Sequence, residues 1–179
     1  LAQLVNVIAP IMTEQGYQVT CYNRSGDKAE HDYMNNVVND CYKGVRLKKV
    51  WTLHKKGISA IIASFSAAVC AAFGNYDVVH FHAEGPCAAL WIPKLFGKRC
   101  IATVHGLDWQ REKWKHGLGA KYIKFGEKVM AKYADEIIVL SQGVQTYFRY
   151  AYGRETVFIP NGVSRPEKKE AFIIREKYG

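Results

Sequence analysis

Hydrophobic positions in the second half of the chain fall into short runs that alternate with helically spaced segments. The runs are rich in β-branched and aromatic residues, as buried strands are, whereas the segments between them repeat apolar positions every three or four residues. The pattern predicts strands over residues 76–82, 99–105, 135–141 and 156–160, and helices over residues 85–97, 119–133 and 142–152. This alternation is typical of an α/β fold, and we expect a Rossmann-like, doubly wound, mainly parallel sheet.

The first half of the chain follows the same scheme less regularly. Apolar spacing predicts helices over residues 1–12 and 58–73, and extended chain over residues 17–22 and 45–53. A doubly wound domain normally begins with a strand and a glycine-rich turn, but here a helix comes first. We therefore expect that the first strand and its loop are missing from this sequence. A charged helix is expected to close the chain over residues 166–178.

Four residues refine the expected ends of these elements. Gly16 is expected to end the first helix, and Pro10 to kink it. Pro93 is expected to bend or end the helix over residues 85–97. Ser141 is expected to cap the helix that follows it.

The composition indicates a reducing compartment and argues against disulfides and a zinc site. The 179 residues, 49% of them hydrophobic, suffice for one domain with a core. The apolar run over residues 58–73 is too short to span a membrane and indicates a buried helix. The cysteines are odd in number and form no CxxC pair, which disfavours disulfides and a zinc site. We expect Cys70, Cys87 and Cys100 to be small core residues in a reducing cytosol.

The net charge of +9 makes nucleic acid, an anionic membrane face and phosphorylated ligands the candidate partners. Basic residues cluster within residues 43–56 and recur at helical spacing within residues 121–132. Solvated faces are the simplest interpretation of both groups. No zinc-finger, helix-turn-helix or RNA-binding aromatic motif is present, so we expect no nucleic-acid partner.

Polar residues or glycines follow every predicted strand of the second half. Ligands of parallel α/β sheets bind beyond the carboxyl ends of the strands, so we expect these residues to line one crevice. The chain contains no Walker A, GxSxG, HExxH or strand-linked GxGxxG motif that would assign the crevice directly. The residues are His80, His82, Glu84, Gly85, His105, Gly106, Asp108, Ser141, Gln142, Gly143, Asn161 and Gly162.

Two histidines alternate along one predicted strand, so both side chains should point to the same face. His80 and His82, with His105 and Asp108, carry the donor atoms for a metal-dependent hydrolase. The alternative is that one of the histidines is a hydrogen-bonded core residue at a sheet edge. We favour this alternative and expect no metal, because a hydrolytic metal site usually has more carboxylates.

Residues 84–86, Glu-Gly-Pro, precede a predicted helix. Gly85 allows close approach to the backbone, Pro86 suits a first helical turn, and the helix N-terminus would suit an anion or a sugar hydroxyl. The alternative is that Glu84 only caps the helix.

The segment TVHGLDWQREKW, residues 103–114, is the densest in chemistry. His105 can donate or accept a hydrogen bond near neutral pH, and Gly106 lets a ligand meet the backbone. Arg111 and Lys113 can hold a phosphate. Of the two tryptophans in the segment, we expect one to stack on a sugar and the other to pack the loop onto the sheet.

Over nearly its whole length the chain resembles the N-terminal domain of bacterial family 4 retaining glycosyltransferases. The closest resemblance is to the rhamnosyltransferase-like branch that builds capsular or cell-surface polysaccharides. HGLDWQR and PNGV are the most specific parts of the match. The stretches that carry it are, in order, DVVHFHAEGP, TVHGLDWQREKW, GEKVMAKYADEIIVLSQGVQTYF and YGRETVFIPNGV.

The resemblance implies a GT-B fold, in which two Rossmann-like domains enclose a cleft. Residues 1–163 would form the acceptor-binding domain, and residues 164–179 would lead to an absent nucleotide-sugar-binding domain. The full enzyme would transfer a sugar, rhamnose in this branch, from a nucleoside diphosphate to a lipid-linked or polysaccharide acceptor, and this stretch alone would be inactive. It would be cytoplasmic, held peripherally on the anionic inner membrane face. It would need no cofactor, since the nucleotide sugar is a substrate.

The resemblance also implies roles for single residues. His105 would be the catalytic histidine of the cleft, near the transferred sugar. The substrate-binding set would comprise Glu84, Gly85, Gly106 and Asp108, with Arg111 and Lys113 added on the basis of their charge, and Asn161 and Gly162 would lie at the domain junction. A non-enzymatic carbohydrate-binding domain is the remaining alternative.

Overall fold

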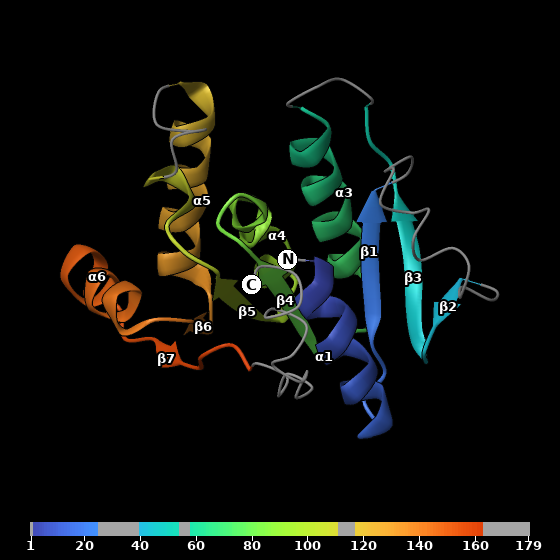
Figure 1. Ribbon diagram of the computed structural model, residues 1–179. Coiled ribbons are helices and arrows are strands. Elements are labelled where there is room, and N and C mark those ends of the chain that lie inside the picture. Colours follow the sequence, from blue (N-terminus) through green and yellow to red (C-terminus); the bar gives the residue numbers. More distant parts are fainter. Residues whose placement is uncertain (1, 25–39, 54–57, 111–116, 163–179) are drawn as a thin grey trace, which may run out of the picture.

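A four-stranded parallel sheet forms the centre of the protein (Figure 1). The computed structural model describes residues 2–24, 40–53, 58–110 and 117–162. The sheet consists of β4 (Val78–His82), β5 (Arg99–Val104), β6 (Glu136–Val139) and β7 (Val157–Phe158), paired in chain order and all parallel. This arrangement confirms the predicted α/β class and places all four carboxyl ends on one edge.

A second sheet of three strands lies beside the first. In it β1 (Thr20–Arg24) runs parallel to β3 (Val45–Val50), and β2 (Cys41–Tyr42) pairs antiparallel with β3. Within the described residues, no ladder joins β1 to β4. The Tyr22 and Tyr76 hydroxyls, 3.0 Å apart, link the two sheets instead.

Helices connect the strands of both sheets (Figure 1). They are α1 (Ala2–Glu14), α3 (Ser59–Phe73), α4 (Trp91–Leu95), α5 (Leu118–Tyr133) and α6 (Gln142–Tyr152), with the short 3-10 turns η1 (Pro86–Ala89) and η2 (Asp108–Gln110). Helix α3 contacts β1 and β3 on one side and η1 and α4 on the other, so it bridges the two sheets. No helix in the described ranges has the length and apolarity to cross a bilayer.

The core is centred on the four-stranded sheet. Leu90, Met130, Ile137 and Phe148 are fully buried in it, from both helices and strands. Cys87 and Cys100 are buried as predicted, but Cys70 is exposed. The prediction for Cys70 is wrong because α3 is apolar on almost every face, so its sequence does not reveal which side faces solvent.

Several element boundaries differ from the sequence predictions. Ser141 is confirmed as the cap of α6, because its Oγ accepts from the Val144 N–H at 3.3 Å. The helix predicted over residues 85–97 is broken before Pro93, where η1 ends and α4 begins. Pro93 fits inside the first turn of α4, where a missing N–H costs nothing. Helix α1 also continues past Pro10, although this proline lies in the interior of the helix.

The predicted strands are longer than the observed ones. Strand β1 begins three residues after the predicted start at Tyr17, β4 begins at Val78, and β7 contains only Val157 and Phe158. The short strand β2 was not predicted. The helix predicted over residues 166–178 lies outside the described residues.

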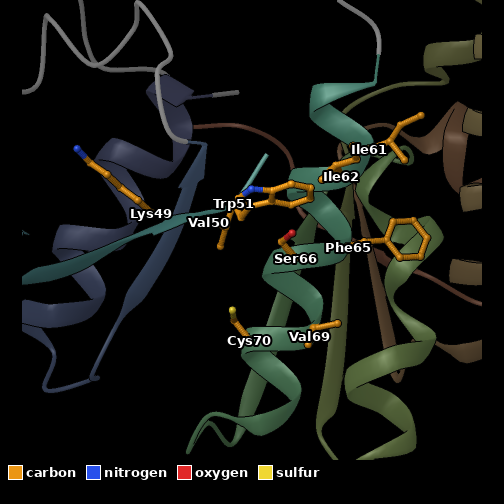
Figure 2. Close-up of a pocket in the computed structure, with 9 residues that line it drawn as sticks. All are labelled: Lys49, Val50, Trp51, Ile61, Ile62, Phe65, Ser66, Val69 and Cys70. Carbon is orange, nitrogen blue, oxygen red and sulfur yellow. The ribbon is translucent and has the colours of Figure 1, made fainter. Parts of the chain in front are cut away.

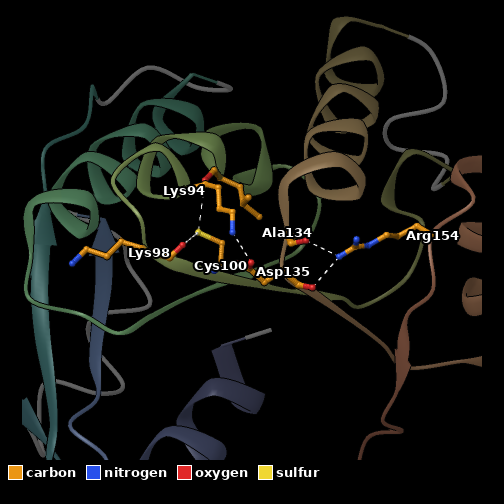
Figure 3. Close-up of polar contacts among 7 residues, drawn as sticks. Lys94, Lys98, Cys100, Ala134, Asp135 and Arg154 are labelled. Atoms are coloured by element: carbon orange, nitrogen blue, oxygen red, sulfur yellow. Dashed lines mark hydrogen bonds and ion pairs between the residues drawn. The ribbon is translucent and has the colours of Figure 1, made fainter.

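One carboxylate fixes the start of β6 (Figure 3). Asp135 accepts from Lys94 Nζ at 2.5 Å and from the Cys100 N–H at 2.7 Å. Burial alone would raise the pKa of Asp135, but these two hydrogen bonds outweigh it and lower that pKa. On the other side, Arg154 donates to the carbonyls of Ala134 and Asp135. The α5–β6 junction is therefore tied to α4, β5 and the segment after α6.

Asp135→Asn is expected to lower the free energy of unfolding by about 1–2 kcal/mol at pH 7, because two charge-assisted hydrogen bonds weaken. Asp77→Asn is the matched control, since the Asp77 side chain is exposed. Because the folded-state pKa of Asp135 is lowered, its contribution is present above about pH 4 and is lost as the pH falls through the folded-state value. Urea denaturation measures both variants, and equal stabilities would contradict this role for Asp135.

Candidate functional site

The carboxyl ends of β4 and β5 bring together residues that are far apart in the sequence. The Asp108 N–H donates to Glu84 Oε2 at 2.8 Å, and His82 Nδ1 lies 3.3 Å from His105 Nε2. These contacts join the segment after β4 to the segment after β5, as the crevice hypothesis requires. The structure thus brings four of the twelve predicted residues into direct contact.

The remaining predicted residues stand at the ends of β6 and β7. Ser141 and Gly143 belong to the first turn of α6. Asn161 and Gly162 follow β7 and are exposed. Parallel pairing places these two segments on the same edge as His105. Arg111 and Lys113 lie outside the described residues.

Three histidines form a stack along this edge. The rings of His80 and His82 are stacked with centroids 4.3 Å apart, which confirms that they share one face. The His82 ring stacks in turn on that of His105, at 5.6 Å. Burial and the neighbouring imidazoles His80 and His105 lower the pKa of His82 to about 3. His82 is therefore neutral at physiological pH and supports the His105 ring without a charge.

The histidines are not arranged to hold a metal ion. In the described part of the chain, no three His, Cys, Asp or Glu side chains converge on one position. His80 Nε2 instead lies 2.8 Å from Thr103 Oγ1, within hydrogen-bonding distance. The contact with Thr103 agrees with the hydrogen-bonding part of the alternative interpretation, but His80 is exposed and is not a core residue.

The chain turns sharply after both strands. Gly106 has φ = 145°, a conformation that a side chain would strain, so glycine is required directly after His105. Ala83 has φ = 71° after β4. Its N–H donates to the Thr103 carbonyl, which extends the β4–β5 ladder into the turn. These two turns point the following residues away from the sheet plane.

Glu84 and Gly85 differ from the picture that the sequence suggested. Glu84 is fully buried and caps no helix, because its carboxylate accepts from the loop residue Asp108. Gly85 has ordinary helical dihedral angles and precedes η1. Since η1 spans only four residues, it offers no helix N-terminus for an anion. Pro86 occupies the first turn of η1, as predicted.

Glu127 on α5 is a site residue that the sequence predictions missed. It is fully buried and accepts from Trp109 Nε1 at 2.9 Å, from the Tyr147 hydroxyl at 2.8 Å and from the Tyr152 hydroxyl. A signal was available, because the buried stripe of α5 places this carboxylate among apolar positions four residues apart. The stripe consists of Ile123, Gly126, Glu127 and Met130.

Trp109 confirms that one tryptophan packs the loop onto the domain. Besides its bond to Glu127, its ring lies under Lys124 Nζ, 3.9 Å from the centroid. Its centroid is 6.3 Å from that of Tyr147 on α6. Trp114, the other tryptophan of this segment, lies outside the described residues. The η2 turn is thus attached to α5 and α6.

A cavity of about 700 Å³ lies away from this edge, between the end of β3 and α3 (Figure 2). Figure 2 shows Trp51 reaching from the end of β3 toward Ile62 on α3. Trp51 keeps 66% of its surface exposed. None of the residues predicted to bind substrate lines this cavity.

The pH dependence of stability should reveal the buried Glu84 carboxyl. Burial, a hydrogen bond with Glu127 and neighbouring carboxylates raise the pKa of Glu84 to about 8. Its stabilising contribution is therefore greatest below the unfolded-state pKa of about 4.3 and declines as the pH rises toward 8. Protonation of His80 and His82, whose pKa values are lowered to about 4 and about 3, affects stability mainly below about pH 6.5, so the range from 6.5 to 8 reports chiefly on Glu84.

Between pH 6.5 and 8, the wild-type free energy of unfolding is expected to fall by up to about 1 kcal/mol per pH unit. Glu84→Gln should flatten this decline, because an amide does not titrate. Glu155→Gln, at an exposed ion pair with Arg149, should leave it unchanged. Urea titrations at closely spaced pH values measure the slope, and an equally steep slope in Glu84→Gln would contradict the assignment.

Two comparisons with known proteins both match the chain to glycosyltransferases. The profile of the family described as Glycosyltransferase Family 4 matches residues 3–165. The chain is similar to the Uncharacterized glycosyltransferase YqgM of Bacillus subtilis (strain 168), with 28% identity over 96 residues. That match covers 53% of this chain and 27% of the relative, so the chain spans only part of the relative's length.

Proposed function

Because the chain belongs to glycosyltransferase family 4, we propose that it is the acceptor-binding domain of an enzyme that transfers a sugar from a nucleoside-diphosphate sugar. In the reaction, the bond between the sugar and the diphosphate breaks and a bond to an acceptor hydroxyl oxygen forms, with loss of the hydroxyl proton. The observation that carries the proposal is the assembly of His82, His105 and Asp108 at the carboxyl edge of a parallel sheet. Ligands of such sheets bind at this edge.

The proposed roles follow from the geometry of the edge. His105, on the stack formed with neutral His82, is a hydrogen-bonding group for the transferred sugar. Gly106 leaves the backbone open to substrate, and Asp108 stands at the start of η2. Arg111 and Lys113 are proposed to bind phosphate on the basis of their charge. We propose retention of anomeric configuration and a rhamnosyl donor only from the resemblance in sequence.

The basic residues of the smaller sheet suggest where an anionic surface would bind. The side chains of Lys43, Arg46, Lys48 and Lys49 are exposed around β3. Trp51, exposed at the end of the same strand, adds an apolar group. Clustered cations attract anionic lipids. A peripheral position on the cytoplasmic membrane face, close to a lipid-linked acceptor, is therefore part of the proposal.

The edge strands of the two sheets support a proposal for the domain organisation. Strand β1 is paired only with β3, and β4 only with β5, among the described strands. Helix α1 exposes Val7, Ile8, Ile11 and Met12, which a further element would cover. We propose that an additional strand of the full-length protein lies between β1 and β4, and that Asn161 and Gly162 lead toward a second, nucleotide-sugar-binding domain.

The experiment that tests the function is a transfer assay with the full-length protein. Nucleoside-diphosphate sugars labelled in the sugar, including a rhamnosyl donor, are incubated with a lipid extract that contains polyprenyl-linked glycans. Label should enter the lipid phase while nucleoside diphosphate is released in equal amount. Release of free sugar alone, or hydrolysis that depends on added zinc or manganese, would contradict the proposal and favour the metal-dependent hydrolase.

A further inference from the structure

Two buried carboxyl groups lie directly behind the loop that follows His105. Glu84 comes from the turn after β4, and Glu127 comes from the middle of α5. Both side chains are fully buried. Two ionised carboxylates in one dry site repel each other and are costly to desolvate. The pair therefore needs a specific arrangement of protons and donors.

Glu127 is surrounded by hydrogen-bond donors. Three donors point at its two oxygens, namely the Trp109 indole N–H and the hydroxyls of Tyr147 and Tyr152. Each donor comes from an element that flanks the edge, either η2 or α6. Hydrogen bonds to a charged acceptor are roughly twice as strong as neutral ones. Burial followed by the bond to Glu127 raises the pKa of Tyr147 to about 12, so this donor keeps its proton.

Glu84 has the environment of a protonated group. Its Oε2 accepts from the Asp108 N–H, while its Oε1 is buried and has no hydrogen-bond partner among the described residues. Glu127 is the neighbouring carboxylate that acts on Glu84, and two carboxylate oxygens can share a hydrogen bond only if a proton lies between them. With the proton on Glu84, every polar atom of the pair has a partner.

We propose that Glu84 holds the single proton of this carboxyl pair and that Glu127 is a positioning residue that fixes residues 105–109 through Glu84 and Trp109. The contacts form a closed path from α5 to the loop. Glu127 accepts from the Trp109 side chain directly, and Glu84, on which Glu127 acts electrostatically, accepts from the Asp108 backbone. Both attachment points lie within four residues of His105. Neither carboxyl touches substrate in this arrangement.

The other groups around the pair agree with a single shared proton. Asp108 and Glu127 are the nearby carboxylates that act on Glu84. Cys87, Tyr122 and Tyr147 are further titratable groups near Glu84, and burial raises the pKa of each. The Tyr122 hydroxyl is buried without a hydrogen-bond partner among the described residues. Lys124 lies over the Trp109 ring, so its charge acts on the loop from outside the pair.

The backbone also holds the pair at a fixed separation. A Cβ at Gly126, next to Glu127, would lie 2.0 Å from the Glu84 carbonyl oxygen. Helix α5 therefore runs in direct contact with the turn that carries Glu84. This close approach is what allows two short acidic side chains from different elements to meet.

The test compares Glu127→Gln with Glu84→Gln by hydrogen exchange, observed by NMR on the whole chain. Glu127→Gln turns one acceptor oxygen into an NH₂ group that faces donors, so exchange of the Trp109 indole and the Asp108 amide should accelerate about tenfold or more. Glu84→Gln keeps an acceptor for Asp108 and gains a donor for Glu127, so both rates should stay within about threefold of wild type. The Asp135 amide, bonded to the Cys100 carbonyl at 2.8 Å, is the internal reference.

The His105 ring provides the readout that separates positioning from general stability. Its ¹⁵N resonances should shift in Glu127→Gln and return toward wild type in Glu127→Asp, which restores the acceptor. Asp135→Asn should leave them in place, although it also destabilises the fold. If Glu127→Gln does not fold, Tyr147→Phe removes one donor and should still accelerate exchange of the Trp109 indole.

Two results would overturn the proposal. Equal acceleration in Glu84→Gln and Glu127→Gln would show that Glu84 is not the proton carrier. Unchanged Trp109 and Asp108 exchange in Glu127→Gln, or in Tyr147→Phe where it is needed, would show that Glu127 does not position the loop. The inference rests on the proposed function only where it concerns the effect of the positioned loop on sugar transfer. Because exchange needs no substrate, its failure is distinguishable from failure of the transfer assay.

Discussion

Replacing Gly126 with alanine is expected to lower the free energy of unfolding by about 3 kcal/mol or more. The new Cβ would lie 2.0 Å from the Glu84 carbonyl oxygen and 3.1 Å from the Ala88 nitrogen. Both atoms belong to the backbone, so a rotamer change cannot relieve the overlap, and α5 must move away from η1. Overpacking of this kind ordinarily costs about 1–3 kcal/mol, and a backbone obstacle places the change at or above the upper end.

Gly143 in α6 is the matched control for this substitution. Its added Cβ would meet nothing within 4 Å, and its φ is not in the left-handed region. Gly143→Ala should therefore raise the stability by about 0.5 kcal/mol, since alanine is the better helix former. Urea denaturation of both variants gives the comparison. A loss below about 1 kcal/mol for Gly126→Ala would mean that α5 does not pack against the Glu84 turn as described.

The strand and helix order of the second half could be predicted from sequence because each element has a clear period. Residues 100–104 are short, mainly apolar and partly β-branched, and β5 lies between two neighbouring strands. Local spacing does not determine where pairing stops, so β7 is shorter than its apolar run. Pro93 predicted a bend or end in the helix over residues 85–97, but the break lies earlier, between η1 and α4, where η1 contacts α5. The exposure of Cys70 likewise depends on packing, because α3 is apolar on almost every face.

The sequence predicted where along the chain the candidate site lies better than it predicted how the acidic side chains are used there. The rule that ligands bind at strand carboxyl ends located His82, His105 and Asp108 correctly along one edge. The same rule suggested that Glu84 faces a substrate, whereas its side chain is buried against the loop. Glu127 lies eighteen positions after Trp109 in the chain, and only the fold reveals that they are bonded.

His105→Ala is expected to reduce the rate of sugar transfer by about 100-fold. Loss of one preorganised hydrogen-bonding group beside the reacting centre typically costs about two to three orders of magnitude in kcat. The alanine also removes one ring of the stack with His82, so the fold must be checked by its unfolding midpoint. Tyr150→Ala, on the exposed face of α6, is the control and should keep full activity.

We propose that the glycosyl-transfer site lies at the carboxyl edge of the parallel sheet. The most direct measurement is the initial rate of label transfer from a nucleoside-diphosphate sugar into the lipid phase, for the full-length wild-type protein and for His105→Ala at matched fold stability. We predict transfer by the wild type and a loss of about 100-fold in the variant. Equal transfer rates for the two proteins, or wild-type release of sugar without an acceptor product, would contradict a glycosyl-transfer site that contains His105.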